Sequence, residues 1–549
     1  MNAVLLLLLA PLAVLIAGAV RFRETRMPDR PPRGPESAAL VAFGLSVIAA
    51  ATLPLTGSIT SPVLGFGEIG FSVRLDIVSV VMLLLTSGLA WVILRFSATH
   101  LQGERKEGHF TGWLSVTLAG VMLLVSAGHL AQLVLGWALT GIGVNRLLIF
   151  YPERAGARRA ARKKMLVARC ADFALVAAAG LLVIAFGTSE IAAIAEAARS
   201  GDLPLAAVAA AGFLALAAIL KSALLPAHGW LTEVMEAPTP VSALLHAGVV
   251  NAGGFLLIRF ADVMLGAPAI LAALVLIGGL SALIGALVML TQPAAKTALA
   301  WSTISQMGFM VLQCGFGLFA LALLHVVAHS LYKAHAFLTA ADAAKTVQAA
   351  RRLGPVAIPG ARAVGRAMGI ALAIYVLVGL PLGLVEKSPQ AVALGAILVL
   401  GIAYLVAQGL ADEAPRALGV ATARASALFA TGYFAFQWLA NAMTAGALPP
   451  TPVAGPLEWA MIALTVASFG ALAVVQALLP AWSAHPAARG LRIHLANGLY
   501  LNALTDRLVG AWAKIPVPVP ISPVIDAPGT QLPADPIPKR SNAKKPVEV

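Results

Sequence analysis

The composition of this 549-residue chain excludes a soluble protein. Hydrophobic residues make up 60% of it, charged residues only 11%, and the mean hydropathy is +0.89, whereas soluble domains are about 45–50% apolar and about 25% charged. The formal charge of +14 comes from Lys and Arg in short loops between apolar runs, which indicates membrane topology and no nucleic-acid partner. Cys170 and Cys314 have no neighbours at metal-ligand spacing, so we expect no disulfide framework, metal or cofactor.

Apolar runs recur along the chain, and each is long enough to predict a transmembrane helix of about 20 residues. The first run is expected to be retained, because Arg21, Arg23 and Arg26 follow it, whereas a secretory signal carries its charges before the apolar run. We predict an all-α polytopic membrane protein with about fifteen spans, at residues 3–20, 38–57, 75–95, 110–128, 130–150, 170–187, 205–225, 238–265, 268–290, 297–318, 321–342, 367–385, 389–410, 418–443 and 457–481.

The loops between these runs alternate in charge. Residues 21–33, 95–106, 154–169 and 345–366 are basic, as is everything after residue 484, and the intervening loops are neutral or acidic. By the positive-inside rule the basic loops lie in the cytoplasm. We therefore expect a bacterial inner-membrane protein with a periplasmic N-terminus and a cytoplasmic C-terminus, which agrees with an odd number of spans.

The predicted cytoplasmic loop at residues 151–169 contains a dense basic cluster. Such a cluster is typical of an anchor on anionic membrane lipid. A docking surface for a soluble partner is the alternative. The cluster consists of Arg158, Arg159, Arg162, Lys163 and Lys164.

Ionisable residues inside the spans are the strongest indication of function, because each costs about 2.5–3.5 kcal/mol at a helix centre. Lys221 stands in an apolar run five residues before Pro226, and prolines break helices in the way that builds mid-membrane ion sites. His246 follows in the next span, which Pro238 and Pro240 open. One alternative is that the Lys221 side chain extends to the membrane interface. The other is that His246 is a core residue whose hydrogen bonds are satisfied and that has no functional role.

A second group of ionisable residues lies on one predicted helix. His325, His329 and Lys333 are spaced at i, i+4 and i+8 and so share one face. Titratable groups stacked along a buried face, with histidines that titrate near neutral pH, are what a proton relay requires. Asp172 could neutralise a buried lysine or be a helix N-terminal charge. Lys296 fits an interfacial lysine and a pathway residue equally well.

Four stretches combine these residues with tryptophans, glycines and prolines: KSALLPAHGWL at 221–231, MEAPTPVSALLHA at 235–247, WSTISQMG at 301–308 and HVVAHSLYKAHAF at 325–337. They resemble the signature of the antiporter-like subunits of respiratory complex I, especially NADH dehydrogenase subunit 5 and its Mrp antiporter relatives. The resemblance extends over about residues 75–345. It implies an antiporter-like fold with two inverted five-helix repeats, each containing a broken helix with a lysine.

The resemblance also implies roles for individual residues. Lys221 and Lys333 match lysines that transfer protons, and His246, His325 and His329 match the polar axis that connects them. We include Asp172, Glu236 and Lys296 in the predicted pathway. The implied division of the chain is N-terminal helices at 1–110, the two repeats at 111–265 and 266–410, C-terminal helices at 411–485, an amphipathic cytoplasmic segment at 486–515 and a disordered Pro-rich tail at 516–549.

Departures from complex I members point to a particular branch. Their fifth span has a Trp-Glu pair whose glutamate partners the broken-helix lysine, but residues 136–140 here read GWALT, and the long lateral C-terminal helix is missing. Lys387 matches the lysine of their twelfth span only poorly. The GWALT segment, the basic loop after it, LLHAGVVNAGG at 244–254 and NGLY at 497–500 instead resemble the DabB family, the membrane subunits of inorganic carbon transporters.

This second resemblance implies a complex with a DabA-like cytoplasmic zinc protein similar to β-carbonic anhydrases. Cation flow through the present chain, expected to be of protons, would drive one-way conversion of CO2 to bicarbonate by that partner. The chain itself would be a transporter subunit and no enzyme. Two alternatives stay open: a proton-pumping subunit of a complex I, membrane hydrogenase or Mrp-type complex, and a structural scaffold without conduction. The sequence leaves open whether the ion is H+ or Na+ and which way it flows.

Overall fold

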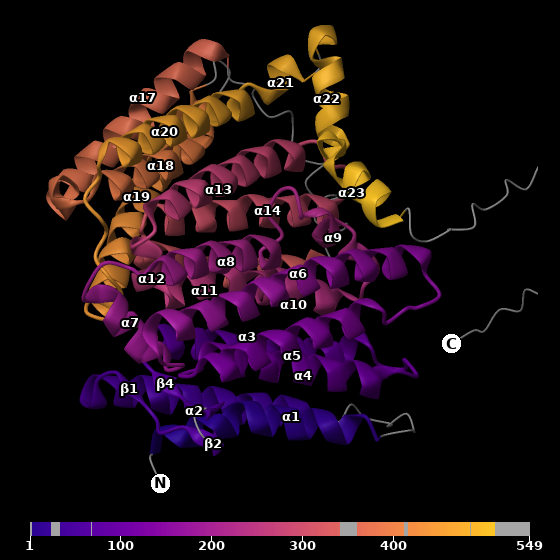
Figure 1. The fold of residues 1–549 in the computed structure, drawn as a ribbon. Coiled ribbons are helices and arrows are strands. Elements are labelled where there is room, and N and C mark those ends of the chain that lie inside the picture. Colours follow the sequence, from indigo (N-terminus) through magenta and orange to yellow (C-terminus); the bar gives the residue numbers. More distant parts are fainter. Residues whose placement is uncertain are drawn as a thin grey trace, which may run out of the picture. The chain divides into compact units, whose positions relative to one another are not determined.

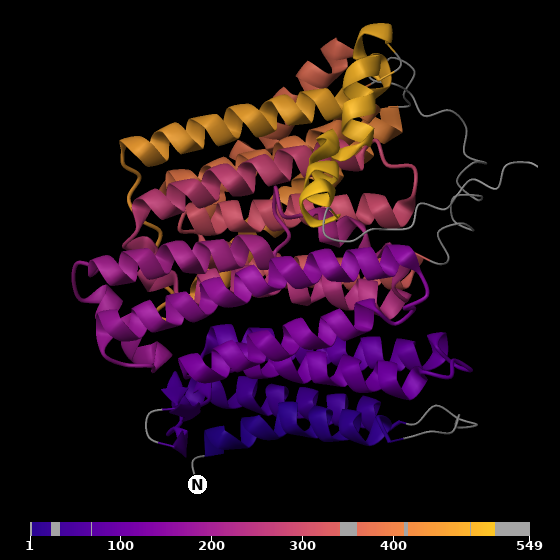
Figure 2. The ribbon, with the colours of Figure 1, turned by 45° about the vertical axis from the view of Figure 1, so that its right-hand side comes forward.

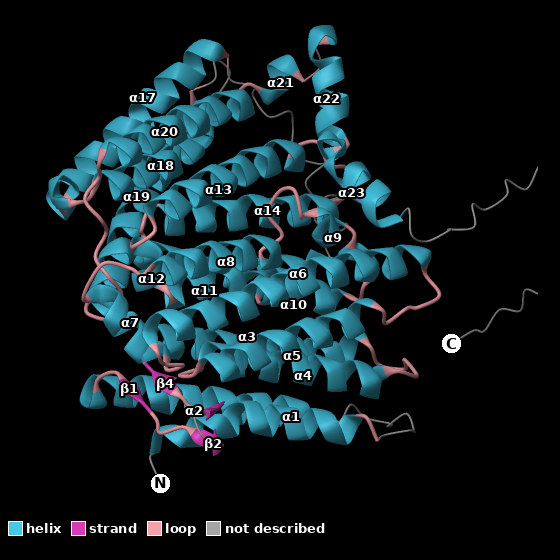
Figure 3. Cartoon of the chain, viewed as in Figure 1, coloured by secondary structure: helices cyan, strands magenta, loops and turns pink. Residues whose placement is uncertain are grey.

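The computed structural model describes residues 3–23, 33–66, 69–340, 360–410, 416–483 and 485–510. Within these residues, each of the fifteen predicted apolar segments is occupied mainly by helix (Figure 3). Among these described residues, ten helices are long and apolar enough to cross a membrane, and Leu205–Lys221 and Pro389–Gly401 are shorter apolar helices. The prediction of an all-helical, multi-pass membrane fold is confirmed.

The N-terminal part of the fold holds the helices α1 to α5 and two small two-stranded sheets, which we call the hairpins (Figure 1). The hairpins, which the sequence analysis did not predict, pair β1 with β4 and β2 with β3, both antiparallel. The elements are η1 (Ala3–Leu8), α1 (Leu9–Arg21), α2 (Gly34–Thr56), β1 (Ile59–Thr60), β2 (Leu64–Phe66), β3 (Ile69–Phe71), β4 (Arg74–Leu75), α3 (Ile77–His100), α4 (Glu107–Val125) and α5 (Leu130–Leu148).

The central part contains the interrupted helices. The predicted span 238–265 is broken twice, and the predicted loop 151–169 is wrong from Ala155 onward, because its Ala, Lys and Arg residues favour helix and extend the sixth span. The elements are α6 (Ala155–Phe186), α7 (Ile191–Arg199), α8 (Leu205–Lys221), α9 (Gly229–Thr232), η2 (Val234–Glu236), α10 (Thr239–Ala247), η3 (Val249–Asn251), α11 (Ala252–Arg259), α12 (Ala261–Leu265), α13 (Pro268–Met289), α14 (Ala295–Gly315) and α15 (Phe319–Leu338).

The C-terminal part adds a helical layer and a short segment that crosses the others. The α18 helix begins at Pro389 behind the N-cap Ser388, whose side chain accepts a hydrogen bond from Ala391 N. The elements are α17 (Ala361–Gly379), η5 (Leu380–Leu382), η6 (Leu384–Glu386), α18 (Pro389–Gly409), α19 (Arg416–Thr444), α20 (Pro456–Ala477), α21 (Leu479–Trp482), η7 (Pro486–Ala488), α22 (Arg489–Ala496), η8 (Gly498–Tyr500) and α23 (Leu501–Gly510).

The long helices run side by side in successive layers, a relation that holds in both views (Figures 1 and 2). The helices α13 and α14 approach each other closely, since a Cβ added at Gly278 would stand 2.6 Å from Gly308 O. Small residues at such crossings let membrane helices approach each other. One end of the long helices is called the basic end here. It carries the loops at residues 101–106 and 149–154 and the first turn of α14. The hairpins, α7 and α12 lie at the opposite end.

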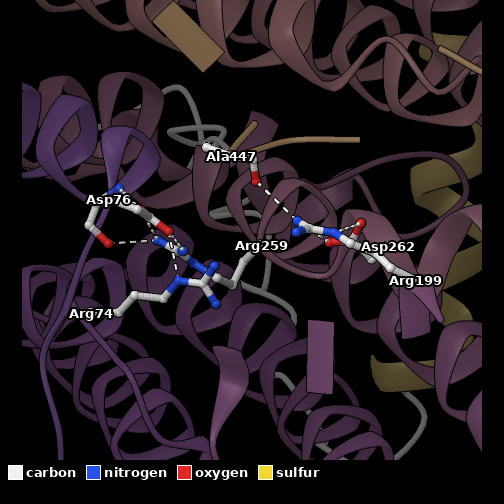
Figure 4. A network of polar contacts seen from close by, with 7 residues as sticks. Arg74, Asp76, Arg199, Arg259, Asp262 and Ala447 are labelled. Carbon is white, nitrogen blue, oxygen red and sulfur yellow. Dashed lines mark hydrogen bonds and ion pairs between the residues drawn. The ribbon is translucent and has the colours of Figure 1, made fainter. Parts of the chain in front are cut away.

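A buried ion-pair network ties the helices together at the opposite end (Figure 4). Asp76 caps α3 by accepting a hydrogen bond from Ser79 N, and Arg259 at the end of α11 donates to both Asp76 carboxylate oxygens, at 2.5 and 3.3 Å. Arg74 Nε donates to the same carboxylate at 2.7 Å. Although burial alone would raise the pKa of Asp76, the Arg259 and Arg74 guanidiniums hold it well below its usual range.

We expect Asp76→Asn to destabilise the protein by about 3–5 kcal/mol, because the neutral amide leaves two buried guanidiniums without their counter-charge. Because the folded pKa of Asp76 is depressed, its stabilisation is present above about pH 4, the unfolded value, and is lost as the pH falls through the folded pKa. The measurement is thermal unfolding of the purified protein in detergent at neutral pH. Asp202→Asn, at an exposed position of the same end, is the control. Equal midpoints for both variants would contradict the prediction.

Candidate functional site

The first candidate group surrounds Lys221, the last residue of α8. The helix ends there because Pro226 lacks an N–H and would clash with the carbonyl of Ser222 in a continued helix. Ser222 Oγ instead donates to Val250 O at 2.9 Å. The Lys221 side chain is buried, and its Nζ lies 4.2 Å from the centroid of the Trp137 ring on α5, a distance that gives a cation–π interaction.

The Trp137 indole joins this lysine to a carboxylate. Its Nε1 donates to Asp172 Oδ1 at 3.0 Å, and Arg169 Nη1 lies 3.3 Å from Asp172 Oδ2. Asp172 stands in the middle of α6, so the alternative of a helix N-terminal charge is wrong. That Asp172 replaces the missing glutamate stays a prediction, which its contact with Trp137 supports.

Two members of the basic cluster are buried inside the protein, which the sequence analysis missed. Lys163 is 2% exposed and its Nζ donates to Glu233 Oε1 and to Asn502 Oδ1, while Lys164 is 6% exposed and its Nζ donates to Gly141 O on α5. Neither is available as a lipid anchor or docking residue. Lys164 is spaced at i, i+4 and i+7 with the apolar Ala168 and Ala171, which turned out to be buried, and this spacing was the signal that could have revealed it.

The second candidate group centres on Lys333, which is fully buried on α15. Its Nζ donates to Leu299 O on α14 at 3.1 Å, and Thr303 Oγ1 donates to the same carbonyl at 3.0 Å. His246 Nδ1 lies 3.0 Å from Thr303 Oγ1. Because the only Thr303 hydroxyl proton goes to Leu299, His246 is the donor in that contact. One carbonyl and one hydroxyl thus connect Lys333 with His246.

The two histidines of α15 extend this group toward the opposite end. His329 Nε2 donates to His246 O at 3.1 Å, and its ring centroid lies 6.0 Å from that of His325. His325 Nδ1 in turn donates to Gln313 Oε1 at 3.0 Å. The predicted residues Lys333, His246, His329 and His325 are therefore brought together in one row.

The interruption between α10 and α11 lies between the two groups. Val250 O accepts the hydrogen bond from Ser222, next to Lys221, and Asn251 Nδ2 donates to Ser330 Oγ on α15 at 2.7 Å. Asn251 also donates to Ala247 O at 2.9 Å. The break thus provides polar contacts on both sides, toward α8 and toward α15.

Lys296 and Lys387 lie apart from this row. Lys296 is in the first turn of α14 at the basic end, where its Nζ donates to Thr239 Oγ1 at 3.3 Å. The Glu236 side chain lies outside the described residues. Lys387 follows η6, and its Nζ lies 5.6 Å from the centroid of the Phe434 ring.

Two cavities follow α15, α18 and α19 from the histidines to the opposite end. The inner one, of about 490 Å³, is lined by His325, His329 and Tyr433, and the outer one, of about 610 Å³, is lined by Glu386 and Lys387. Both include Leu321 in their walls. One cavity thus adjoins His325 and His329, and a second, which shares Leu321 with it, adjoins Lys387.

A C-terminal segment covers the broken helix at the basic end. Gly498 has a φ of +59° and lies against Trp301, where a Cβ would stand 2.8 Å from the indole. Glycine is therefore the residue that fits at position 498 of the NGLY turn. Asn502 Nδ2 donates to Glu233 Oε1 at 2.7 Å. In both views α22 runs across the direction of the long helices (Figures 1 and 2).

The chain is similar to one described protein family and to several known proteins. The family described as NADH:quinone oxidoreductase/Mrp antiporter, TM, matches residues 127–387. A probable inorganic carbon transporter subunit DabB2 from Halothiobacillus neapolitanus is 35% identical over 517 residues, which cover 92% of this chain and 93% of that protein. The chain belongs to the DabB family. A DabB from Hydrogenovibrio crunogenus is 43% identical over 286 residues, 52% of this chain and 55% of that protein.

The fold of this DabB-family chain also resembles that of a solved membrane complex. The Mrp complex from a Dietzia species gives a TM-score of 0.60 at 23% sequence identity, over 92% of this chain and 59% of that chain. The predicted antiporter-like fold and the resemblance drawn from the sequence motifs are therefore confirmed. Within the described ranges, no group of three or more His, Cys, Asp or Glu side chains could hold a metal ion.

Proposed function

We propose that this chain is the cation-conducting membrane subunit of an energy-coupled inorganic carbon uptake complex in a bacterial inner membrane, and that the cation is the proton. The observation that carries the proposal is the pair of buried lysines, Lys221 and Lys333, beside the interruption between α10 and α11. Ser222, next to Lys221, donates to Val250 O at this interruption, and Leu299 O and Thr303 connect Lys333 with His246 on α10. Two DabB relatives named as probable inorganic carbon transporter subunits support it.

The proposed division of labour assigns the carbon chemistry to a partner. A DabA-like cytoplasmic zinc protein hydrates CO2 to bicarbonate, and proton flow through this chain makes the conversion one-way. The basic end faces the cytoplasm and the N-terminus faces the periplasm, as the charge of the loops predicts. Residues 111–265 and 266–410 act as the two repeats, with Lys221 in the first and Lys333 in the second.

In this proposal the proton pathway has two halves. Lys221, Trp137 and Asp172 form the half near the basic end, and Lys333 with His246, His329 and His325 forms the other. The two cavities that lead from His325 past Glu386 and Lys387 connect the second half with the opposite side of the membrane. Lys296 and Glu236 belong to the proposed pathway at the basic end.

The proposal is tested by expressing the tagged chain and its neighbouring genes in a carbonic-anhydrase-deficient host. We expect a DabA-like zinc protein to copurify with the chain and the pair to restore growth in air. Copurification of complex I, membrane hydrogenase or Mrp subunits, without such rescue, would overturn the proposal in favour of a redox-driven pump or antiporter. A pair that rescues growth equally well with Lys221→Ala would leave this chain as a scaffold.

We expect Trp137→Phe to slow transport about tenfold. The phenyl ring keeps a face for the Lys221 ammonium, but the hydrogen bond to Asp172 is lost, and a bond to a charged group contributes about 1.5–3 kcal/mol, where 1.4 kcal/mol corresponds to about tenfold. The measurement is the initial rate of inorganic carbon accumulation. Trp113→Phe on α4 is the control. Equal rates for both variants would exclude the indole N–H from the mechanism.

A further inference from the structure

Lys164 is a buried lysine that neither the sequence motifs nor the proposed pathway uses. It lies on α6 between the exposed Met165 and the buried Lys163, and its own side chain is only 6% exposed. Its Nζ donates to Gly141 O. Burying an ammonium group in the membrane-embedded part of a protein is costly, so such a group needs a reason to be there.

The position of Gly141 places Lys164 beside the first proton group. Gly141 follows Trp137 by four residues, so the two lie one turn apart on the same face of α5, with Gly141 nearer the basic end. Trp137 holds the Lys221 ammonium on its ring and the Asp172 carboxylate on its N–H. Lys164 therefore stands between the basic end and Lys221.

The charges around Lys164 do not balance if every group is ionised. The Lys164 ammonium feels the charges of three neighbours. They are Lys221 on α8 and, on α6 itself, Asp172 and Arg169. Arg169 already pairs with Asp172, and Glu233, from the segment between α9 and η2, pairs with Lys163 and Arg159. Arg146 of α5 lies over the Trp113 ring instead. The Asp172 carboxylate is thus the one negative charge among those acting on Lys164, beside the positive charges of Lys221 and Arg169.

Two ammonium groups that share one carboxylate in a low-dielectric site titrate together, since a proton on one disfavours a proton on the other. Such coupling favours proton transfer between the two lysines, because the proton can move from one amine to the other without changing the net charge of the site. A lysine can make this exchange, whereas an arginine stays protonated.

We propose that Lys164 is the residue that exchanges protons between the basic-end solvent and Lys221. In one step an N–H bond of the Lys164 ammonium breaks and an N–H bond forms on the neutral Lys221 amine, directly or through a water molecule, and the reverse step returns the proton. Solvent at the basic end then protonates or deprotonates Lys164. The inference rests on the proposed proton conduction and assigns its first group at the basic end.

The test compares Lys164 variants in the complex of this chain with its partner. Proton flux is measured in inside-out vesicles at an imposed membrane potential, with the pH at the basic end varied from about 5.5 to 8.5 around the histidine range. Lys164→Arg keeps the positive charge and a donor for Gly141 O but cannot exchange. We expect it to lose at least about tenfold of the flux at neutral pH. We expect Lys164→His to recover flux only at the acidic end of the range.

Arg162→Ala, an exposed neighbour on the same helix, should behave like the unaltered chain. If arginine is not accommodated, Lys164→Gln, which also donates but cannot exchange, takes its place. Flux within about twofold of the unaltered chain in Lys164→Arg or Lys164→Gln, with the same pH profile, would overturn the inference. If Lys221→Ala also kept full flux, the proposed conduction itself would fail, so the two failures are distinguishable.

Discussion

Lys221→Ala and Lys333→Ala are each expected to abolish inorganic carbon accumulation by cells that express the chain with its partner. Each substitution removes the ammonium that stands at the Trp137 ring or at Leu299 O, and alanine can neither carry a proton nor bias its neighbours. A loss of at least about a hundredfold is expected, because no neighbouring group can take over a missing step in series. The measurement is the initial rate of accumulation, with the amount of chain in the membrane determined in parallel.

The control is Lys106→Ala, at an exposed lysine of the loop between α3 and α4. It should accumulate carbon at the rate of the unaltered chain. Lys221→Arg and Lys333→Arg should be as inactive as the alanine variants, because arginine keeps the charge but does not release its proton. Full activity in one alanine variant would remove that lysine from the mechanism and leave the other half of the pathway to be tested alone.

The helices were predictable because the bilayer sets a length and a composition that a single sequence displays. In the described part of the chain, helices occupy most of each of the fifteen apolar runs, and the break after Lys221 follows from Pro226. The short hairpins before α3 were not predictable in the same way. They depend on pairing between short strands, such as Ile59 with Leu75, that carry no strong periodic signal.

The buried charges were predictable only in part. His325, His329 and Lys333 share a helical face, so local spacing was enough to group them. Lys163 and Lys164 were assigned to a loop because a run of basic residues also fits an exposed anchor, and only the continuation of α6 buries them. A charge run on a long helix can thus have one exposed and one buried face.

Contacts between distant parts of the chain lay beyond single-sequence reasoning. Asp76 and Arg259 are 183 residues apart. Asp76 stands at the edge of the predicted span 75–95 and Arg259 lies within the predicted span 238–265, so neither position suggested the other as its partner. The Trp137 ring between Lys221 and Asp172 joins three helices. The resemblance to known families supplied the expectation of a polar axis, but the side chains that complete it, such as Thr303 and Gln313, emerged only from the packing.

Carbon accumulation by the chain and its zinc partner is expected to collapse when a protonophore is added. If this chain only conducts protons, the energy comes from the membrane gradient, about 2.3 kcal/mol per charge per 100 mV plus the pH difference, and a protonophore removes both. Expressed alone, the chain should support no accumulation, because the hydrating site is assigned to the partner. The partner alone should support none, because it would lack a link to the gradient.

The measurement is growth in air of a carbonic-anhydrase-deficient host, together with accumulation of labelled inorganic carbon, with and without protonophore. A soluble carbonic anhydrase expressed in the same host is the control, because its rescue of growth does not depend on a proton gradient. Rescue by this chain without a partner would contradict the division of labour. Rescue by both chains that persists undiminished under protonophore would contradict proton coupling, and a sodium ionophore would then test Na+ as the ion that passes Lys221 and Lys333.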